Sequence, residues 1–165
     1  MKALKSLLKE LLNLDNTQVI SSNEPFLVGD APFITVDLES SQPSGVGKCD
    51  YNGNGEIETI RTSFTSVVNL RFFGTNAYQM AVSAQAVMQS SHAQAQLHKL
   101  KAAMFGTSAI RDLSASVGAG YEERAGLELY FSHTHITTTS LRRIEEVSVS
   151  VDADYLQQEI IIKEK

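Results

Sequence analysis

The most constraining feature of this chain is a long alternation of apolar and polar residues over positions 57–73. Side chains of a β-strand point alternately to opposite faces, so this pattern predicts one long strand with a single apolar face. The apolar face carries Ile60, Phe64, Val68, Leu70 and Phe72. The opposite face carries Arg61, Ser63, Thr65, Asn69 and Arg71. An apolar sheet face must be covered by another layer, so we expect a sheet packed against helices.

A helical period precedes the strands. Apolar residues at helical spacing predict an amphipathic helix over residues 1–14, with Leu4, Leu7, Leu8 and Leu11 on one side. Charged residues inside this segment argue against a signal peptide. Neither this segment nor any other has the roughly 18 consecutive apolar residues of a membrane-spanning helix. The helix has few lysines and no large aromatic residue, so packing on a sheet is a better prediction than binding to a membrane surface.

The remaining pattern places further helices and strands around the long strand. We expect an irregular segment at residues 23–32, a strand from Phe33 with Ile34, Val36 and Leu38 on one face, and a loop over residues 40–56. Thr75 or Asn76 is predicted to cap a helix that breaks near residues 90–92 and resumes until Gly106. We then expect strands around Ile110 and Leu113, Leu127 to Phe131, Val147 to Val151 and Ile160 to Ile162, with a turn at residues 118–120.

This order predicts an α+β fold with an antiparallel or mixed β-sheet and helices packed on one face. We expect one domain over residues 1–165, with an amphipathic helix at 1–14, an α+β core at 33–154 and a C-terminal extension at 155–165. An open sheet has two edges, and a protein either guards such edges or uses them for assembly.

Residues 50–61, DYNGNGEIETIR, imitate a calcium-binding loop, with Asp50, Asn52 and Asn54 at alternate positions. The twelfth position, which should supply a bidentate carboxylate, is Arg61, a cation that would oppose a bound ion. Asn-Gly pairs favour tight turns between strands. We therefore predict a turn between two strands, with calcium binding as the weaker alternative.

The chain offers few residues for catalysis or metal binding. His133 and His135 would share one face of a strand, but no third ligand is evident, while His92 and His98 fall in a helical region. The single cysteine, Cys49, excludes an intrachain disulfide and fits synthesis in a reducing cytoplasm. No nucleophile elbow, zinc-protease helix or phosphate-binding loop occurs. We predict a protein that is not an enzyme and has no metal or cofactor.

The net charge of −5 over 165 residues lacks the basic footprint of a protein that grips phosphates. Nucleic-acid binding is therefore not expected to be the main task.

Four short segments give the chain a family resemblance: FFGTNA at 72–77, RDL at 111–113, YEERAGLEL at 121–129 and IEEV at 144–147. In this order they resemble phage neck or tail-terminator proteins. The likeness covers residues 33–154 and is not matched at the first helix or at the Asn/Gly loop.

The resemblance implies a structural virion protein in the tail or neck. It would form a ring, usually a hexamer, that caps the tail tube and meets the head-side connector or stopper, with the tail sheath as a further partner. DNA would pass through the lumen without specific binding, and no membrane would be involved. The alternatives are a tail-tube or other structural tail subunit, or a small ligand- or calcium-binding module.

Three groups of residues are our candidates for the interface of such an assembly. Leu4, Leu7, Leu8 and Leu11 would dock on a neighbouring component or on the chain's own sheet. The turn with Asp50, Asn52, Asn54 and Glu56 would project toward the tube or lumen. The charged residues Arg111, Asp112, Glu122 and Arg124 would form ion pairs that fix the ring, although exposed ion pairs commonly contribute little.

Overall fold

A computed structural model of the chain describes residues 2–23, 31–117, 120–143, 146–153 and 156–163. Its contacts divide the chain into two compact units, one of residues 1–46 and 62–135 and the other of residues 47–61 and 136–165. Among the described residues the fold combines three α-helices with a mixed sheet, so the predicted α+β class is confirmed.

Seven strands of the described chain form one sheet. Its main path has the order β1 (Val19–Ile20), β2 (Phe33–Pro43), β4 (Ile57–Phe73), β9 (Arg124–Ser140) and β5 (Ala102–Thr107). β3 (Lys48–Asn52) pairs with β4, and β6 (Arg111–Asp112) pairs with β9. The short β1 runs parallel to β2, whereas β2, β3, β5 and β6 are antiparallel to their longer partners. Separate two-stranded ribbons are formed by β7 (Ala115–Val117) with β8 (Gly120–Glu122), and by β10 (Glu146–Ala153) with β11 (Leu156–Lys163).

The predicted long strand is confirmed, because β4 spans Ile57–Phe73. Its even-numbered residues Val68, Leu70 and Phe72 are buried. The same parity rule places Leu127, Leu129 and Phe131 of β9 in the core. These neighbouring strands build one apolar face.

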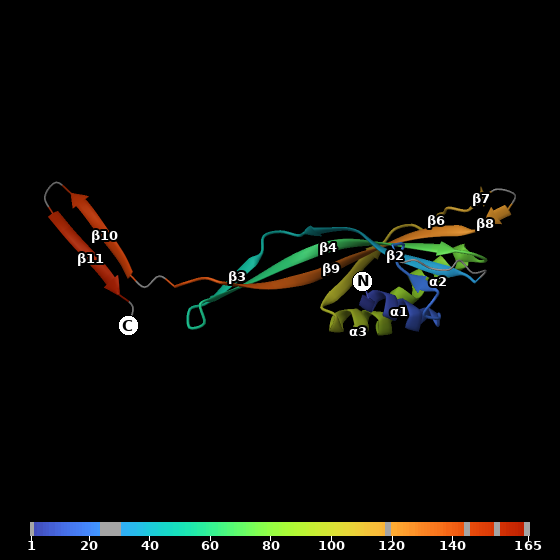
Figure 1. Cartoon of the computed structure of the whole chain (residues 1–165), viewed down its shortest axis with the longest axis horizontal. Coiled ribbons are helices and arrows are strands. Elements are labelled where there is room, and N and C mark those ends of the chain that lie inside the picture. Colours follow the sequence, from blue (N-terminus) through green and yellow to red (C-terminus); the bar gives the residue numbers. More distant parts are fainter. Residues whose placement is uncertain (1, 24–30, 118–119, 144–145, 154–155, 164–165) are drawn as a thin grey trace. The chain divides into compact units, whose positions relative to one another are not determined.

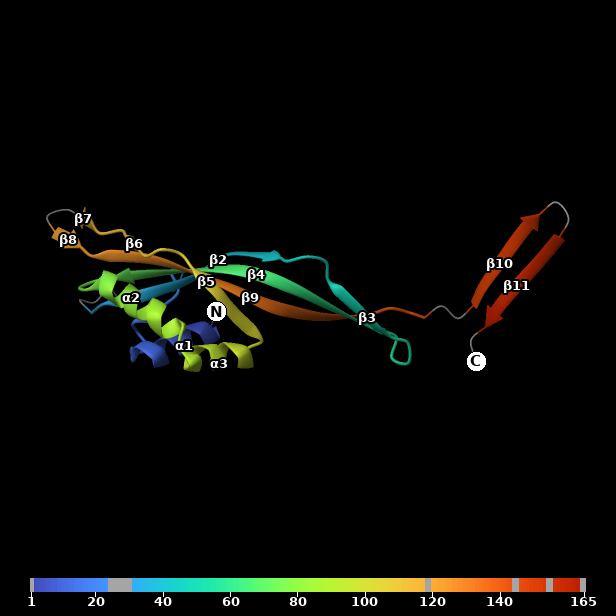
Figure 2. The same cartoon turned by 180° about the vertical axis from the view of Figure 1, so that it is seen from behind.

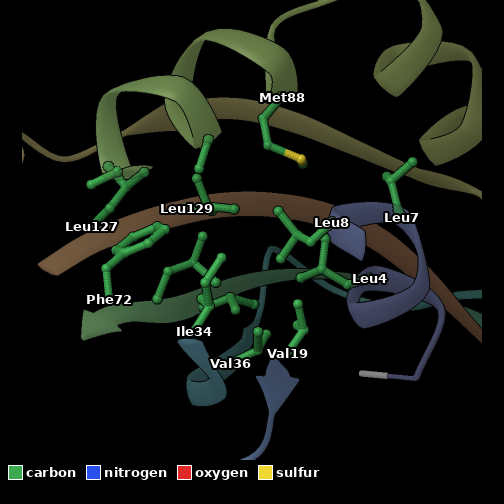
Figure 3. Packing of buried hydrophobic residues seen from close by; sticks show 14 of the residues in the cluster. Leu4, Leu7, Leu8, Val19, Ile34, Val36, Phe72, Met88, Leu127 and Leu129 are labelled. Carbon is green, nitrogen blue, oxygen red and sulfur yellow. The ribbon is translucent and has the colours of Figure 1, made fainter. Parts of the chain in front are cut away.

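Three helices cover that face: α1 (Lys2–Leu12), α2 (Ala77–Met88) and α3 (Ser91–Lys99). Figures 1 and 2 show them on the same side of the sheet in both views. Figure 3 shows Met88 of α2 and Leu8 of α1 pointing toward the sheet residues Ile34 and Leu129. All four are fully or almost fully buried. The predicted packing of helices on one face is therefore confirmed.

The ends of the helices depart partly from prediction. Asn76 is the N-cap of α2, but its side chain makes no capping hydrogen bond and its backbone is left-handed, with φ 63°. Its own backbone N–H donates to Glu123 Oε2 at 2.6 Å. The predicted break is confirmed: α2 ends at Met88, and Ser90 Oγ accepts a hydrogen bond from the N–H of Ala93 at 3.2 Å.

Two predicted boundaries were wrong. Residues 40–43 continue β2, and residues 48–52 form β3, where a loop was expected. The helical region ends at Lys99 and not at Gly106, because residues 102–107 form β5 and Met104 pairs with Phe131 of β9. The expected strand around Ile110 and Leu113 is reduced to the two residues of β6.

The strands predicted at Val147 to Val151 and Ile160 to Ile162 are confirmed as β10 and β11. The expected irregular segment falls mainly on residues 24–30, and the expected turn on residues 118–119, which lie outside the described residues.

Candidate interaction surfaces

The leucines of α1 belong to the core of their own chain. Leu4, Leu7 and Leu8 are buried, and Leu11 is partly buried against the same cluster. A hydrogen bond also ties α1 to α3, with His92 Nε2 at 3.0 Å from Glu10 Oε1. In this arrangement the three buried leucines are covered by the chain itself and leave a partner only the outer surface of α1.

The segment that imitates a calcium loop is the turn of the β3–β4 hairpin. Asp50 forms ion pairs with Lys48, at 3.4 Å, and with Arg61 across the hairpin. Asn52 Oδ1 accepts a hydrogen bond from the backbone N–H of Asn54 at 3.2 Å, as in an Asx turn. Arg61 thus occupies the carboxylate that a cation would need. The geometry favours the turn over the calcium site, and no group of three metal-binding side chains occurs among the described residues.

The hairpin turn also exposes apolar groups and acidic groups. Tyr51 and Ile57 are 46% and 44% exposed. Glu56 and Glu58, which flank Ile57, form no ion pair with any residue that the structure describes. The backbone carbonyl of Glu56 accepts a hydrogen bond from Leu141 N–H at 2.9 Å. The carboxylates of this turn therefore remain available to a partner.

A second surface lies on the sheet face opposite the helices. There a pocket of about 320 Å³ is lined by three arginines from three strands or strand ends: Arg71 of β4, Arg111 of β6 and Arg124 of β9. Phe73 and Leu113 supply its apolar lining. We call these five residues the arginine pocket. The antiparallel pairing of Arg111 with Gly126 brings β6 beside the start of β9 and so assembles the pocket.

Two of the three guanidinium groups have carboxylate partners. Arg111 pairs with Glu128, which also accepts a hydrogen bond from Tyr130 Oη at 3.1 Å and raises the pKa of that phenol. Arg124 pairs with Glu122, and this hydrogen bond raises the pKa of the guanidinium. Arg71 is exposed and has no hydrogen-bond or ion-pair partner in the part of the chain that the structure describes. The pocket therefore holds one guanidinium without a carboxylate.

Arg124 is the best-anchored of the three. Its guanidinium carbon lies 5.6 Å from the centre of the Phe73 ring, a cation–π arrangement. Its backbone N–H donates to Ser114 Oγ at 3.1 Å. Its Nε is buried, with no hydrogen-bond partner among the described residues.

The predicted cluster of four charges is thus only partly assembled. The structure brings Glu122 and Arg124 together in one ion pair, and it gives Arg111 a partner, Glu128, that sequence reasoning missed. Asp112 instead accepts a hydrogen bond from Ser114, which lowers the pKa of its carboxyl. Arg71 was also missed as a site residue, although its place on the polar face of the long strand was a usable signal.

A third surface is an apolar groove of about 480 Å³ between α1, α3 and the sheet. Leu38 and Leu100, which are 51% and 49% exposed, lie at its rim. His133 also lines it, with its Nε2 at 2.9 Å from Ser66 Oγ. The Phe64 ring stacks on His133 at a centroid distance of 5.7 Å and meets His135 edge-on at 6.3 Å. Both histidines therefore have neighbours that account for their positions without a metal.

Cys49 is exposed, and the Ser66 Oγ–His133 Nε2 contact of 2.9 Å has no carboxylate beside the imidazole among the described hydrogen bonds. No described helix is long and apolar enough to cross a membrane.

A comparison with protein families matches residues 1–157 to the phage neck terminator proteins. The chain belongs to this family. The match confirms the predicted resemblance, and it extends over α1 and the β3–β4 hairpin of this neck terminator, which the short segments had left out. A search of curated proteins found no match. As a neck terminator, the chain has a structural role in the tail or neck of the virion and associates with other phage tail or head proteins.

Proposed function

We propose that this neck terminator forms a closed ring, a homohexamer, which ends the tail tube and joins it to the head-side connector or stopper. Membership of the neck terminator family is the observation that carries the proposal. In a contractile tail the sheath would be a further partner. The ring would be built in the host cytoplasm and would remain in the virion.

The open edge of the sheet supports a role in assembly. β2 pairs with β1 only at Ile34 and Thr35, so its residues 36–43 have no strand on the side away from β4 within the described sheet. A register shift between Leu38 and Ser40, and the polar residues that follow it, limit which strands can pair with this edge. Bulges and polar side chains prevent indiscriminate pairing while leaving the edge open to a specific partner.

The charge of the chain supports a lumen through which DNA passes. A net charge of −5 per chain would be multiplied in a ring and would repel phosphates instead of binding them. A head-to-tail contact repeated by rotation closes into a ring when the angle permits, and it needs two different surfaces on each chain. The hairpin turn and the arginine pocket are two such surfaces.

Light scattering of the purified full chain, with negative-stain images before and after adding tail tubes, tests this function. We expect rings in solution, or smaller species that become one ring at a tube end. Long tubes formed by the chain alone would instead identify a tail-tube subunit. A chain that stays monomeric with and without tubes would contradict the proposal.

A further inference from the structure

The arginine pocket has positive charge that no carboxylate among the described residues neutralises. Glu122 forms an ion pair with Arg124, and Glu128 forms one with Arg111. No described carboxylate pairs with Arg71. A planar guanidinium presents two parallel N–H donors that match the two oxygens of a carboxylate. The pocket is therefore chemically suited to one additional carboxylate beside Arg71.

The walls of the pocket restrict what can carry that carboxylate. Phe73 and Leu113 line it, and Leu113 is 46% exposed. An acidic residue beside an exposed apolar or aromatic side chain would fill both parts of the pocket. Interfaces of this kind combine a central apolar contact with charge pairs that fix the register.

The β3–β4 hairpin turn of the same chain has the complementary composition. Glu56 and Glu58 have no ion-pair partner among the described residues, and Ile57 between them is half exposed. Tyr51, also exposed, is the cross-strand partner of Glu58. One short turn thus offers carboxylates and apolar groups together, as the pocket requires.

We propose that the arginine pocket of one subunit binds the β3–β4 hairpin turn of a second copy, with Glu58 pairing with Arg71 and Tyr51, the cross-strand neighbour of Glu58 on the same face, packing near Leu113. This inference rests on the proposed ring. The two surfaces differ, so the contact is head-to-tail and can repeat around a closed ring. A DNA phosphate fits less well, because it would leave the apolar lining formed by Phe73 and Leu113 without a partner.

A charge-swap experiment tests the contact. Arg71→Glu and Glu58→Arg each place like charges opposite one another, so each should raise the protein concentration needed for assembly by at least about tenfold. The double variant restores opposite charges and should return that concentration to within about threefold of wild type. Lys99→Glu, at an exposed lysine of α3 on the opposite face of the sheet from the pocket, makes the same charge change and should assemble as wild type.

Assembly is measured by light scattering and negative stain in the full chain, with circular dichroism to show that each variant is folded. Glu58→Gln, which removes only the charge, provides a milder variant and should assemble less readily than wild type. If wild type forms rings and both reversals form them equally well, the inference is wrong while the proposed function stands. If wild type forms no ring with or without tail tubes, both the proposed function and this inference are wrong. Saturable binding of a short DNA duplex that Arg71→Glu abolishes, with assembly unchanged, would assign the pocket to phosphate instead.

Discussion

Leu8→Ala measures whether α1 is part of the core of its own chain. Leu8 is fully buried in a cluster with sheet residues and Met88. The substitution removes about three methylene equivalents, worth roughly 2.4 kcal/mol of transfer free energy at about 0.8 kcal/mol each. The cavity left behind adds to this loss, because a packed core relaxes only partly. We expect the free energy of unfolding to fall by about 3–4 kcal/mol.

The assay is urea unfolding of the full chain, monitored by circular dichroism. The slope of the unfolding free energy against urea concentration should be the same for all variants. A thermal scan should show a midpoint lowered by roughly 6–16 °C, at about 2–4 °C per kcal/mol for a chain of this size. Ser6→Ala, at an exposed position of the same helix, should change stability by less than about 0.5 kcal/mol. Each measurement is repeated at several protein concentrations, because assembly stabilises a folded subunit by mass action.

A loss of less than about 1 kcal/mol for Leu8→Ala in the dilute, unassembled chain would contradict the packing of α1 on its own sheet. Such a result would mean that α1 does not pack on its own sheet there. The leucine face would then be free for a neighbouring component. Leu11→Ala, at a partly buried position, should lower the free energy of unfolding by more than Ser6→Ala and by less than Leu8→Ala.

Three further predictions concern local features. Ser90→Ala removes the side chain that caps α3 and should cost about 1 kcal/mol in urea unfolding. Gly74→Ala should destabilise the chain more than Gly45→Ala: both positions have positive φ, but only at Gly74 would the new Cβ meet a proline, at 3.1 Å. Equal losses would show that the proline gives way. Ser114→Ala should raise the pKa of Asp112 toward its ordinary value, seen in an NMR titration of that carboxyl. Because folding lowers this pKa, the contribution of Asp112 to stability is complete above its unfolded pKa and is lost as the pH falls through its folded value.

The long strands could be predicted from sequence because one face of each is buried along much of its length. In β4 and β9 the buried apolar residues keep a single parity, and this pattern has no helical equivalent. β3 was missed because its sequence, KCDYN, is polar and its residues are mostly exposed. β5 was read as helix because the short run AAMF carries no period of its own, and only pairing with β9 decides its conformation.

The candidate surfaces were harder to predict than the fold. Helical spacing showed that α1 has an apolar face, but spacing does not say whether that face meets the same chain or another. The arginine pocket joins residues that lie far apart in sequence, and only strand order brings Arg71 and Arg111 beside Arg124. The pairing of Arg111 with Glu128 depends on the same register. Such contacts are properties of the sheet and are not visible in a local pattern.

In the proposed assembly, this neck terminator ends the tail tube as a single ring at the junction with the head. Electron microscopy of virions that carry the full chain with a gold-labelled tag shows where the protein lies. We expect label at one level of the particle, between head and tail. Label distributed along the tail, or confined to its far tip, would contradict it.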